Sequence, residues 1–363
     1  MLLYKIGLTL IPGVGDINGK KLVAYCGGVE AVFKEKRGNL LKIPGIGQSV
    51  VNSIHNSKIL LRSEEEMKFI EKYQITPLFY LDDDYPTRLT HCVDSPILLY
   101  YKGNANLNSE KIVSIVGTRN ASTYGKGICE KIVDDLQSMN IIVVSGLAYG
   151  IDTCAHIASL KNGLKTIAVL AHGLDIIYPQ QNKTLSKKLL KNGGLLTEFM
   201  TKSKPDRENF PKRNRIVAGL CDAVIVIESS KKGGALITAN IANSYNRDVF
   251  AVPGNVGEKL SEGCNNLIKT NRAALIQSAE DLKYIMGWES ETQISTSKQR
   301  KLFVKLSDEE EILFNILKEK KEMDIDTLRF TSNLSMSKVA AALLNMEFEG
   351  ILISLPGKIY RLC

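Results

Sequence analysis

One segment of the sequence combines the glycines, the carboxylate and the histidine that a phosphate site or an acid–base pair would need. Residues 145–156 are SGLAYGIDTCAH, and they directly follow the apolar run at residues 141–144. This order predicts a buried strand that ends in a glycine-rich turn and opens a helix, where open α/β sheets bind phosphate-bearing ligands. We therefore expect Ser145, Gly146 and Gly150 to lie at a bound anion. The alternative is that the glycines serve only a tight turn.

Asp152 and His156 stand four residues apart in this segment, so a helix places them on one face. The spacing would suit an acid–base pair in an enzyme. No nucleophile accompanies them, and the four histidines of the chain include no pair at the i, i+4 spacing of a helical metal site. We interpret both side chains as structural, with a hydrogen bond that fixes the start of the helix, and predict no metal, no cofactor and no enzymatic activity.

Length and charge indicate several domains and a polyanionic partner. At 363 residues the chain exceeds the size at which one core usually stops growing. Residues 1–105 carry 13 basic and 11 acidic side chains, residues 106–286 carry 23 and 16, and residues 287–363 carry 11 and 12. The basic excess lies in the middle of the chain and favours a polyanion there, the alternative being a solvated lysine-rich surface.

The cysteine pattern and the hydropathy exclude several classes of protein. Seven cysteines occur without a Cys-x-x-Cys pair, and no apolar run approaches the length of a membrane span. A disulfide framework and a zinc site are therefore not indicated. We expect a reduced, cytoplasmic protein with no membrane partner.

From residue 112 onward, short β-branched apolar runs alternate with helical stretches, which predicts a parallel sheet covered on both faces. The expected strands are residues 112–116, 141–144, 166–170, 195–197, 223–227 and 249–252. Several of them end in glycine or polar residues. The ligand groove should lie where those ends converge.

The amino-terminal segment, residues 1–65, contains two similar turns, IPGVG at 11–15 and IPGIG at 43–47. They are typical of a tandem helix-hairpin-helix (SAM-like) module, in which the turn directs backbone amides at a nucleic-acid phosphate. The alternative is a small helical bundle used for packing or protein contact. Residues 66–106 are expected to connect this module to the central domain at residues 107–286.

The carboxyl-terminal segment begins with polar residues 287–300, which predict a flexible linker. Residues 301–363 then suggest three helices, near 308–320, 325–330 and 335–349, and a hairpin through 351–355 and 359–362. That order is typical of a winged helix. Such domains often bind duplex DNA, but the third helix has only Lys338 as a base and ends in Glu347 and Glu349. A protein-contact role is therefore an equal alternative.

Five ordered motifs resemble the DNA-processing protein A (DprA/Smf) family. They are GTRNASTYG at 117–125, SGLAYGIDTCAH at 145–156, GLDIIYP at 173–179, NFPKRNRIVAGL at 209–220 and KKGGALITA at 231–239. The resemblance implies an α/β fold with an extended Rossmann-like parallel sheet core, flanked by helix-hairpin-helix and winged-helix modules. It further implies a homodimer that binds and protects single-stranded DNA and loads the RecA recombinase in natural transformation and homologous recombination.

The chemistry of individual residues agrees with this resemblance. Arg119 follows the first central strand, where its guanidinium would clamp a phosphate instead of forming a surface ion pair. One of Arg213 and Arg215 is alternatively a clamp to an acidic residue, and Phe210 suits either base stacking or loop anchoring. The predicted DNA or phosphate contacts are Arg119, Ser145, Gly146, Gly150, Phe210, Lys212, Arg213, Asn214, Arg215, Lys231, Lys232, Gly233 and Gly234. The predicted structural or groove-lining residues are Gly117, Asp152, His156, Asp175, Tyr178, Asn182 and Thr238.

The competing hypothesis is an enzyme that acts on a nucleotide or sugar phosphate, similar to phosphoribohydrolases. Against it, Gly233-Gly234 is followed by Ala235 and Leu236 and lacks the Gly-Thr and nearby Glu that those enzymes carry. The chain also has no P-loop, and no Gly-x-Gly-x-x-Gly follows a predicted central strand.

Overall fold

The structure is a computed structural model that describes residues 1–288 and 306–363. Contacts divide the described chain into a large unit, Met1–Tyr245 with Val249–Ala279, and a small unit, Asn246–Asp248 with Glu280–Cys363. Each unit has its own hydrophobic core. Most of the linker predicted at residues 287–300 lies outside the described residues.

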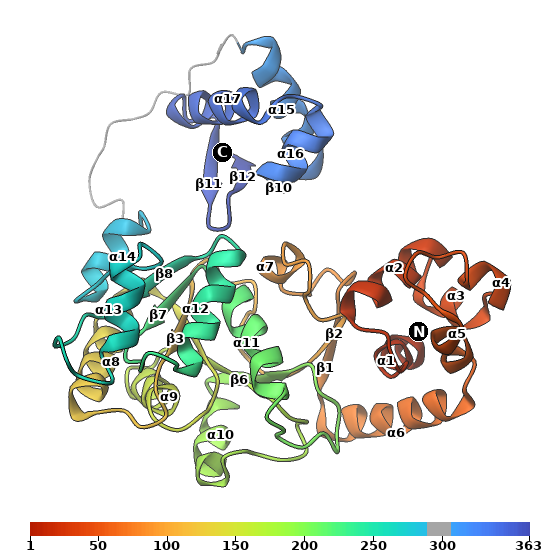
Figure 1. Ribbon diagram of the computed structural model, residues 1–363, viewed down its shortest axis with the longest axis horizontal. Coiled ribbons are helices and arrows are strands. Elements are labelled where there is room, and N and C mark those ends of the chain that lie inside the picture. The colour runs from red at the N-terminus through yellow and green to blue at the C-terminus, as the bar shows by residue number, and fades with distance from the viewer. Residues whose placement is uncertain (289–305) are drawn as a thin grey trace. The chain divides into compact units, whose positions relative to one another are not determined.

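A sheet forms the centre of the large unit (Figure 1). Within the described residues it has nine strands in the order β1-β2-β6-β5-β4-β3-β7-β8-β9. The run from β6 to β7 is parallel, as is the pair β8 and β9, whereas β2 is antiparallel to β6 and β1 is antiparallel to β2. The strands are β1 (Thr76–Phe79), β2 (Leu98–Gly103), β3 (Ile112–Val116), β4 (Ile142–Ser145), β5 (Thr166–Val169), β6 (Gly193–Thr197), β7 (Ala223–Val226), β8 (Asp248–Ala251) and β9 (Ala274–Leu275).

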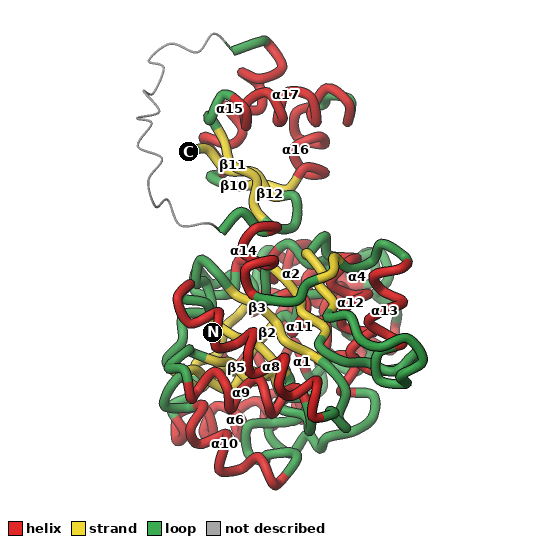
Figure 2. The backbone as a smooth tube through the Cα atoms, turned by 90° about the vertical axis from the view of Figure 1, so that its left-hand side faces the viewer, coloured by secondary structure: helices red, strands yellow, loops and turns green. Residues whose placement is uncertain are grey.

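Helices cover both faces of this sheet (Figure 2). Every strand residue from β3 to β7 is buried. Alternate residues of β5 face opposite cores: Ile167 and Val169 pack with α11 and α12, whereas Ala168 packs with α10. The helices of this region are α7 (Thr87–Thr90), α8 (Thr123–Asp135), α9 (Ile151–Lys161), α10 (Lys183–Leu189), α11 (Asn209–Gly219), α12 (Gly234–Ser244) and α13 (Glu262–Lys269), with short 3-10 turns at Leu136–Met139 and Gln180–Asn182.

The six strands predicted from the sequence are all present, with ends shifted by at most two residues. The difference lies in the expected connector, which contributes β1 and β2 to the same sheet. In β2 all four apolar residues from Leu98 to Tyr101 are buried. Leu98 and Tyr100 pack with the amino-terminal helices, while Leu99 and Tyr101 pack with the central core. This strand therefore joins the amino-terminal core to the central core that contains α11 and α12.

Helices alone precede β1, and they pack around one core with the two predicted turns at its surface. Gly13 and Gly45 take the same left-handed conformation in these turns, with φ of +80° and +86°. At the start of α2, Asp16 accepts a hydrogen bond of 2.8 Å from the backbone N–H of Ile97. The start of α2 thus lies against the polypeptide before β2. The helices are α1 (Leu2–Thr9), α2 (Asp16–Cys26), α3 (Val29–Lys34), α4 (Arg37–Leu40), α5 (Gln48–Ile54) and α6 (Ser57–Tyr73).

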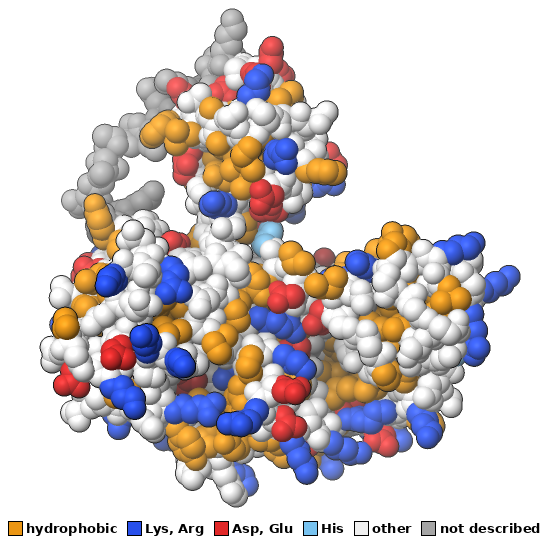
Figure 3. All heavy atoms as spheres, viewed as in Figure 1, with side chains coloured by type: hydrophobic (Ala, Val, Ile, Leu, Met, Phe, Trp, Pro, Cys, Tyr) orange, Lys and Arg blue, Asp and Glu red, His pale blue; other side chains and the backbone are white. Residues whose placement is uncertain are grey.

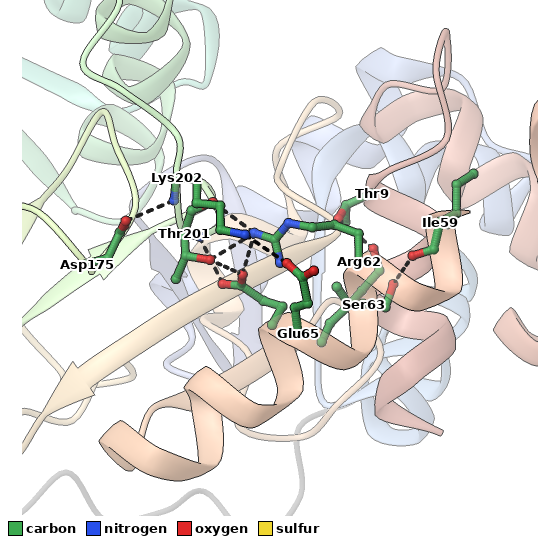
Figure 4. A network of polar contacts seen from close by, with 10 residues as sticks. Thr9, Ile59, Arg62, Ser63, Glu65, Asp175, Thr201 and Lys202 are labelled. Carbon is green, nitrogen blue, oxygen red and sulfur yellow. Dashed lines mark hydrogen bonds and ion pairs between the residues drawn. The ribbon is translucent and has the colours of Figure 1, made fainter. Parts of the chain in front are cut away.

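A polar network ties α6 to the loop that follows β6 (Figure 4). Arg62 donates to the carboxylate of Glu66 and to both oxygens of Thr201, each at 2.8 Å. Lys202 pairs with Glu65 at 2.8 Å, and its backbone N–H donates to Asp175 at 2.9 Å. Arg62 and Glu66 have little exposure, so the charged hydrogen bonds of Arg62 to Thr201 are the strong ones, whereas the exposed Lys202–Glu65 pair contributes little. The network therefore holds the amino-terminal helices on the central sheet, and Asp175 is part of it.

The small unit contains three helices and a three-stranded antiparallel sheet in the order β10-β12-β11 in the part of it that follows residue 305. Its core is built from leucines of the first two helices and from Val339, Leu343 and Met346 of the third. These elements are α15 (Asp308–Lys320), β10 (Glu322–Asp324), α16 (Ile325–Ser332), α17 (Met336–Phe348), β11 (Leu352–Leu355) and β12 (Ile359–Leu362), and α14 (Ala279–Ile285) precedes them. No described helix is both long and apolar enough to span a membrane.

Candidate nucleic-acid interface

A cavity of about 310 Å³ opens beside the carboxyl ends of β3 and β4 and the start of α12, the helix that follows β7. β3 lies between β4 and β7, so the chain leaves it first to one side of the sheet and later returns on the other. Open α/β sheets bind ligands at such a switch point. We call this hollow the switch-point cavity. Its walls include the predicted residues Gly117, Arg119, Gly146, Asp152, Phe210, Arg213, Asn214, Gly233, Gly234 and Thr238.

Arg119 and Phe210 form a stacked pair at the wall of this cavity. The guanidinium carbon of Arg119 lies 5.0 Å from the centre of the Phe210 ring, and the Arg119 side chain is exposed. The Phe210 ring lies in turn 6.0 Å from that of Tyr178. A stacked guanidinium keeps its in-plane N–H groups for a phosphate, and partly exposed rings suit the faces of nucleobases. The sequence hypothesis that Phe210 anchors a loop in the core is therefore not favoured.

The start of α12 forms another part of the cavity wall. Gly233 is its N-cap, no side chain caps the first turn, and Gly233, Gly234 and Ala235 all line the cavity. The amides at the start of a helix carry a positive partial charge and attract anions. The start of α12 and Arg119 therefore both offer positive charge to the cavity.

The start of α9, in contrast, is occupied by protein groups, which corrects the anion site expected at Ser145, Gly146 and Gly150. The N–H of Ile151 donates to the carbonyl of Thr118 at 3.2 Å, and the carboxylate of Asp152 lies in the first turn. The hydroxyl of the fully buried Ser145 donates to the carbonyl of Ile115 at 2.6 Å. A carboxylate at this helix start takes the place of an external anion.

The glycines of this turn make room for protein atoms. A Cβ at Gly146 would lie 2.1 Å from Nη1 of Arg213, and one at Gly150 would lie 2.2 Å from the carbonyl oxygen of Thr118. Gly150 also has a φ of +77°, which favours glycine. Of the two, only Gly146 lines the switch-point cavity. The prediction that both glycines let the backbone approach a ligand is therefore wrong for Gly150.

Arg213 forms the buried floor of the cavity. It is 4% exposed and donates to the carbonyl of Val169. Burial lowers the pKa of Arg213 to about 10, with Asp152 opposing the shift, and burial raises the pKa of Asp152, with Arg213 opposing it. The two charges partly compensate each other in a poorly solvated site. A ligand phosphate near this floor would meet both, so Arg119 and α12 are the better phosphate contacts.

His156 does not pair with Asp152, so the acid–base arrangement raised by their spacing does not form. Its ring is fully buried, and Nδ1 lies 2.7 Å from Oγ1 of Thr166. Asp152 instead accepts from the N–H of Ala148 at 3.3 Å, a contact at the start of α9. Neither group offers the cavity a proton-transfer pair.

The buried neutral His156 predicts a loss of stability in acid. Burial, with a smaller contribution from Arg213, lowers its pKa from 6.5 to about 3. Between these values the unfolded chain binds more protons, so stability is complete above pH 6.5 and falls as the pH decreases. From pH 7 to pH 5 we expect a loss of about 2 kcal/mol from this group. Thermal melts of the wild type and of His156→Asn at both pH values measure it, and equal pH slopes in the two proteins would contradict it.

Arg215 corrects a second prediction, because it does not line the cavity. Its guanidinium pairs with Asp16 at 3.0 Å and with Glu198, and it donates to the carbonyl of Asp94. Its side chain is 11% exposed. The sequence left open which of the two arginines clamps an acidic residue. Arg215 is that arginine, and it fastens α2 to the central domain.

The remaining predicted residues lie at or near the cavity in different roles. Asn182 is buried and donates to the carbonyl of Leu147 and to Thr153, so it is structural. Tyr178 lines a narrow pocket beside Phe210. Lys212 is exposed at the start of α11. Lys231 and Lys232 lie outside the switch-point cavity and line a neighbouring hollow.

Glu228 is a positioning residue that sequence reasoning did not select. It follows β7, is 4% exposed, and accepts hydrogen bonds from the N–H of Ser122 at 2.9 Å and from the Ser122 hydroxyl. Its carbonyl accepts from the N–H of Thr118 at 2.8 Å. Both contacts fix the loop that carries Arg119. The one signal in the sequence was its place at the end of a predicted strand.

Lysine and arginine side chains gather on the face of the large unit where α9, α12 and α13 lie (Figure 3). This agrees with the excess of 23 basic over 16 acidic residues between positions 106 and 286. Among the described residues, no three His, Cys, Asp or Glu side chains group together as metal ligands.

The fold and this site together define a class of protein: an α/β protein whose covered, largely parallel sheet presents a cationic cavity at its switch point. A sequence profile described as "DNA recombination-mediator protein A" matches residues 76–286. The chain belongs to this family.

Curated relatives agree over much of the chain. DNA processing protein DprA of Streptococcus pneumoniae is 44% identical over 58% of this chain and 75% of its own length. Protein Smf of Synechocystis is 38% identical over 78% of this chain and 72% of its own length.

Two solved structures share the fold. The X-ray structure of DprA from Streptococcus pneumoniae has a TM-score of 0.66 and 34% identity, and covers 78% of this chain and 98% of its own. A Helicobacter pylori DprA structure, whose title names a single-stranded DNA binding mode, has a TM-score of 0.54 and 28% identity, and covers 60% of this chain and 97% of its own.

Proposed function

We propose that this chain binds single-stranded DNA in the switch-point cavity, as a binding protein and not as an enzyme. The observation that carries the proposal is the Arg119 guanidinium over the Phe210 ring, with its carbon 5.0 Å from the ring centre, at a cavity that the uncapped start of α12 also lines. A stacking surface beside positive charge recognises the base faces and the backbone of a single strand without reading its sequence. The single-stranded DNA named for the Helicobacter pylori relative supports the same ligand.

We further infer the cellular role that the family description supports. A recombination mediator would protect incoming single strands and load the RecA recombinase onto them during natural transformation. We also propose that the chain acts as a homodimer, so that two cavities hold one strand. Light scattering of the full chain at micromolar concentrations tests the dimer, and a monomer throughout would remove it.

The flanking parts receive narrower proposals. We propose that residues 1–65 form a tandem helix-hairpin-helix module, supported by the matching left-handed glycines at positions 13 and 45. We propose a winged helix for residues 306–363, supported by three helices followed by the β11–β12 hairpin.

Binding should be tolerant of sequence, stronger for single strands than for duplex, and weaker in salt. Because each phosphate contact releases a counterion, we expect the dissociation constant to rise about tenfold between 50 and 200 mM salt. Fluorescence anisotropy with labelled oligonucleotides of several sequences measures this, beside a screen for nucleotide turnover. Binding that ignores salt, a strong preference for duplex, or turnover of a nucleotide would overturn the proposal.

A further inference from the structure

A second hollow, of about 250 Å³, lies on the other side of α12 from the switch-point cavity. We call it the outer cavity. The two hollows share two residues, Gly233 and Ile237, as lining. Ile237 is 44% exposed and stands on α12 as the ridge between them. Gly233 has no side chain, so a bound chain crossing from one hollow to the other meets only backbone there.

The rim of the outer cavity is cationic. Lys231, Lys232 and Arg272 line it, and all three side chains are exposed. Arg272 is held in place, because Nε donates to Thr270 at 2.9 Å and Nη1 donates to Asn240 at 3.3 Å. None of the described residues that line this hollow is acidic. Three positive charges with no carboxylate among them favour a ligand that carries at least one negative charge.

The floor of the outer cavity is apolar and carries amides at its edge. Leu267 is buried and Leu236 is half-buried, while Asn240 and Asn266 line the side. An apolar floor beside a cationic rim fits the two halves of a nucleotide, since the base has an apolar face and the phosphate carries the charge. A purely inorganic anion would gain nothing from the leucines.

We infer that the outer cavity takes the continuation of the DNA strand that occupies the switch-point cavity. The strand crosses α12 at Gly233, places bases on either side of Ile237, and brings its next phosphates to Lys231, Lys232 and Arg272. This inference rests on the proposed function and adds the path of the strand. It gives the two lysines, which do not reach the first cavity, and Arg272 a common role.

The test uses DNA strands of different length, because a short strand fills only the switch-point cavity and a longer one also reaches the outer cavity. Lys231→Gln with Lys232→Gln, and separately Arg272→Gln, are compared with the wild type on oligothymidylates of increasing length. For the shortest strand that the wild type binds, we expect the variants to have the same affinity as the wild type. For longer strands, we expect their affinity to be lower by about fivefold or more. For the double variant the slope of log affinity against log salt should fall by about 1.4, because two single-strand phosphate contacts are lost.

Lys187→Gln with Lys188→Gln is the matched control, since it removes the same charge from two exposed lysines of α10. It should change affinity less than twofold at every length. Equal losses in control and test variants, or test losses that do not depend on length, would overturn the inference. So would a change in self-association of Arg272→Gln without DNA in light scattering, which would make this face a contact between copies of the chain. Failure of the proposed function is visible separately, as a wild type that does not bind single strands in a salt-dependent way.

Discussion

Replacing Arg119 by glutamate is expected to weaken single-strand binding by about tenfold or more, because a charged phosphate contact is worth about 1.5–3 kcal/mol and the reversal adds repulsion. The melting temperature should stay close to that of the wild type. Arg119 is exposed, and the contact that holds it is the face of Phe210, so its loss leaves no buried group unpaired. Anisotropy titrations and thermal melts of the same preparations measure both quantities.

Two control variants give the result its meaning. Lys187→Glu makes the same charge reversal on an exposed side chain of α10 that lines neither cavity, and it should cost much less affinity. Arg119→Lys keeps the charge but loses the planar guanidinium, which packs on Phe210 and can donate two hydrogen bonds to one phosphate. We therefore expect an intermediate loss of affinity. Full binding by Arg119→Glu would refute the switch-point cavity as the DNA site.

Deleting residues 300–363 is expected to cost far less than Arg119→Glu. The described part of this segment, residues 306–363, carries ten acidic and seven basic side chains, a net charge of −3. On α17 the one base, Lys338, pairs with Glu309 at 2.8 Å. If the deletion abolished binding while Arg119→Glu bound normally with an unaltered melting curve, the site would belong to the small unit. The switch-point cavity would then be reconsidered as a site for a small phosphate compound.

The central strands could be predicted because their information is local. A buried parallel strand is a short β-branched run that ends in glycine or a polar residue, and this pattern gave all six predicted strands. β2 has a similar apolar run, but its place depends on antiparallel pairing with β6, in which Tyr101 lies opposite Leu196. No local pattern specifies a partner almost a hundred residues away. β1 pairs with β2, so its place in the sheet could not be predicted without that of β2.

The sequence predicted the location of the site better than it predicted the roles of the individual residues. Two of the predicted strand ends, those of β3 and β4, line one cavity. Arg213 and Arg215, two positions apart on α11, nevertheless point in different directions. Two residues on a helix differ by about 200° in direction, so one arginine enters the sheet core and the other meets Asp16 and Glu198. The rotation of α11 about its own axis, relative to the sheet, decides which of the two arginines is buried. The sequence of α11 does not specify that rotation.

Gly150 shows the same limit and gives the prediction with the largest expected effect on stability. Its glycine-rich turn was predicted, but the reason for glycine lies in another segment: a Cβ would meet the carbonyl oxygens of Thr118 and Arg119 at 2.2 and 2.6 Å. These atoms are backbone and cannot rotate away. Gly150→Ala is therefore expected to lower the free energy of unfolding by about 3 kcal/mol or more, through a disfavoured φ and a backbone collision together.

Gly163→Ala is the matched control, because Gly163 also has a positive φ, +71°, but a Cβ there would meet nothing within 4 Å. It should cost only the conformational penalty, about 1 kcal/mol. Denaturant unfolding of both variants measures the difference, and equal losses would show that the contact with the Thr118–Arg119 backbone is not tight. A second readout links this turn to function. The collision presses on the backbone of Thr118 and Arg119. We therefore expect Gly150→Ala to displace Arg119 and to lose single-strand affinity under conditions in which it remains folded, whereas Gly163→Ala should bind like the wild type.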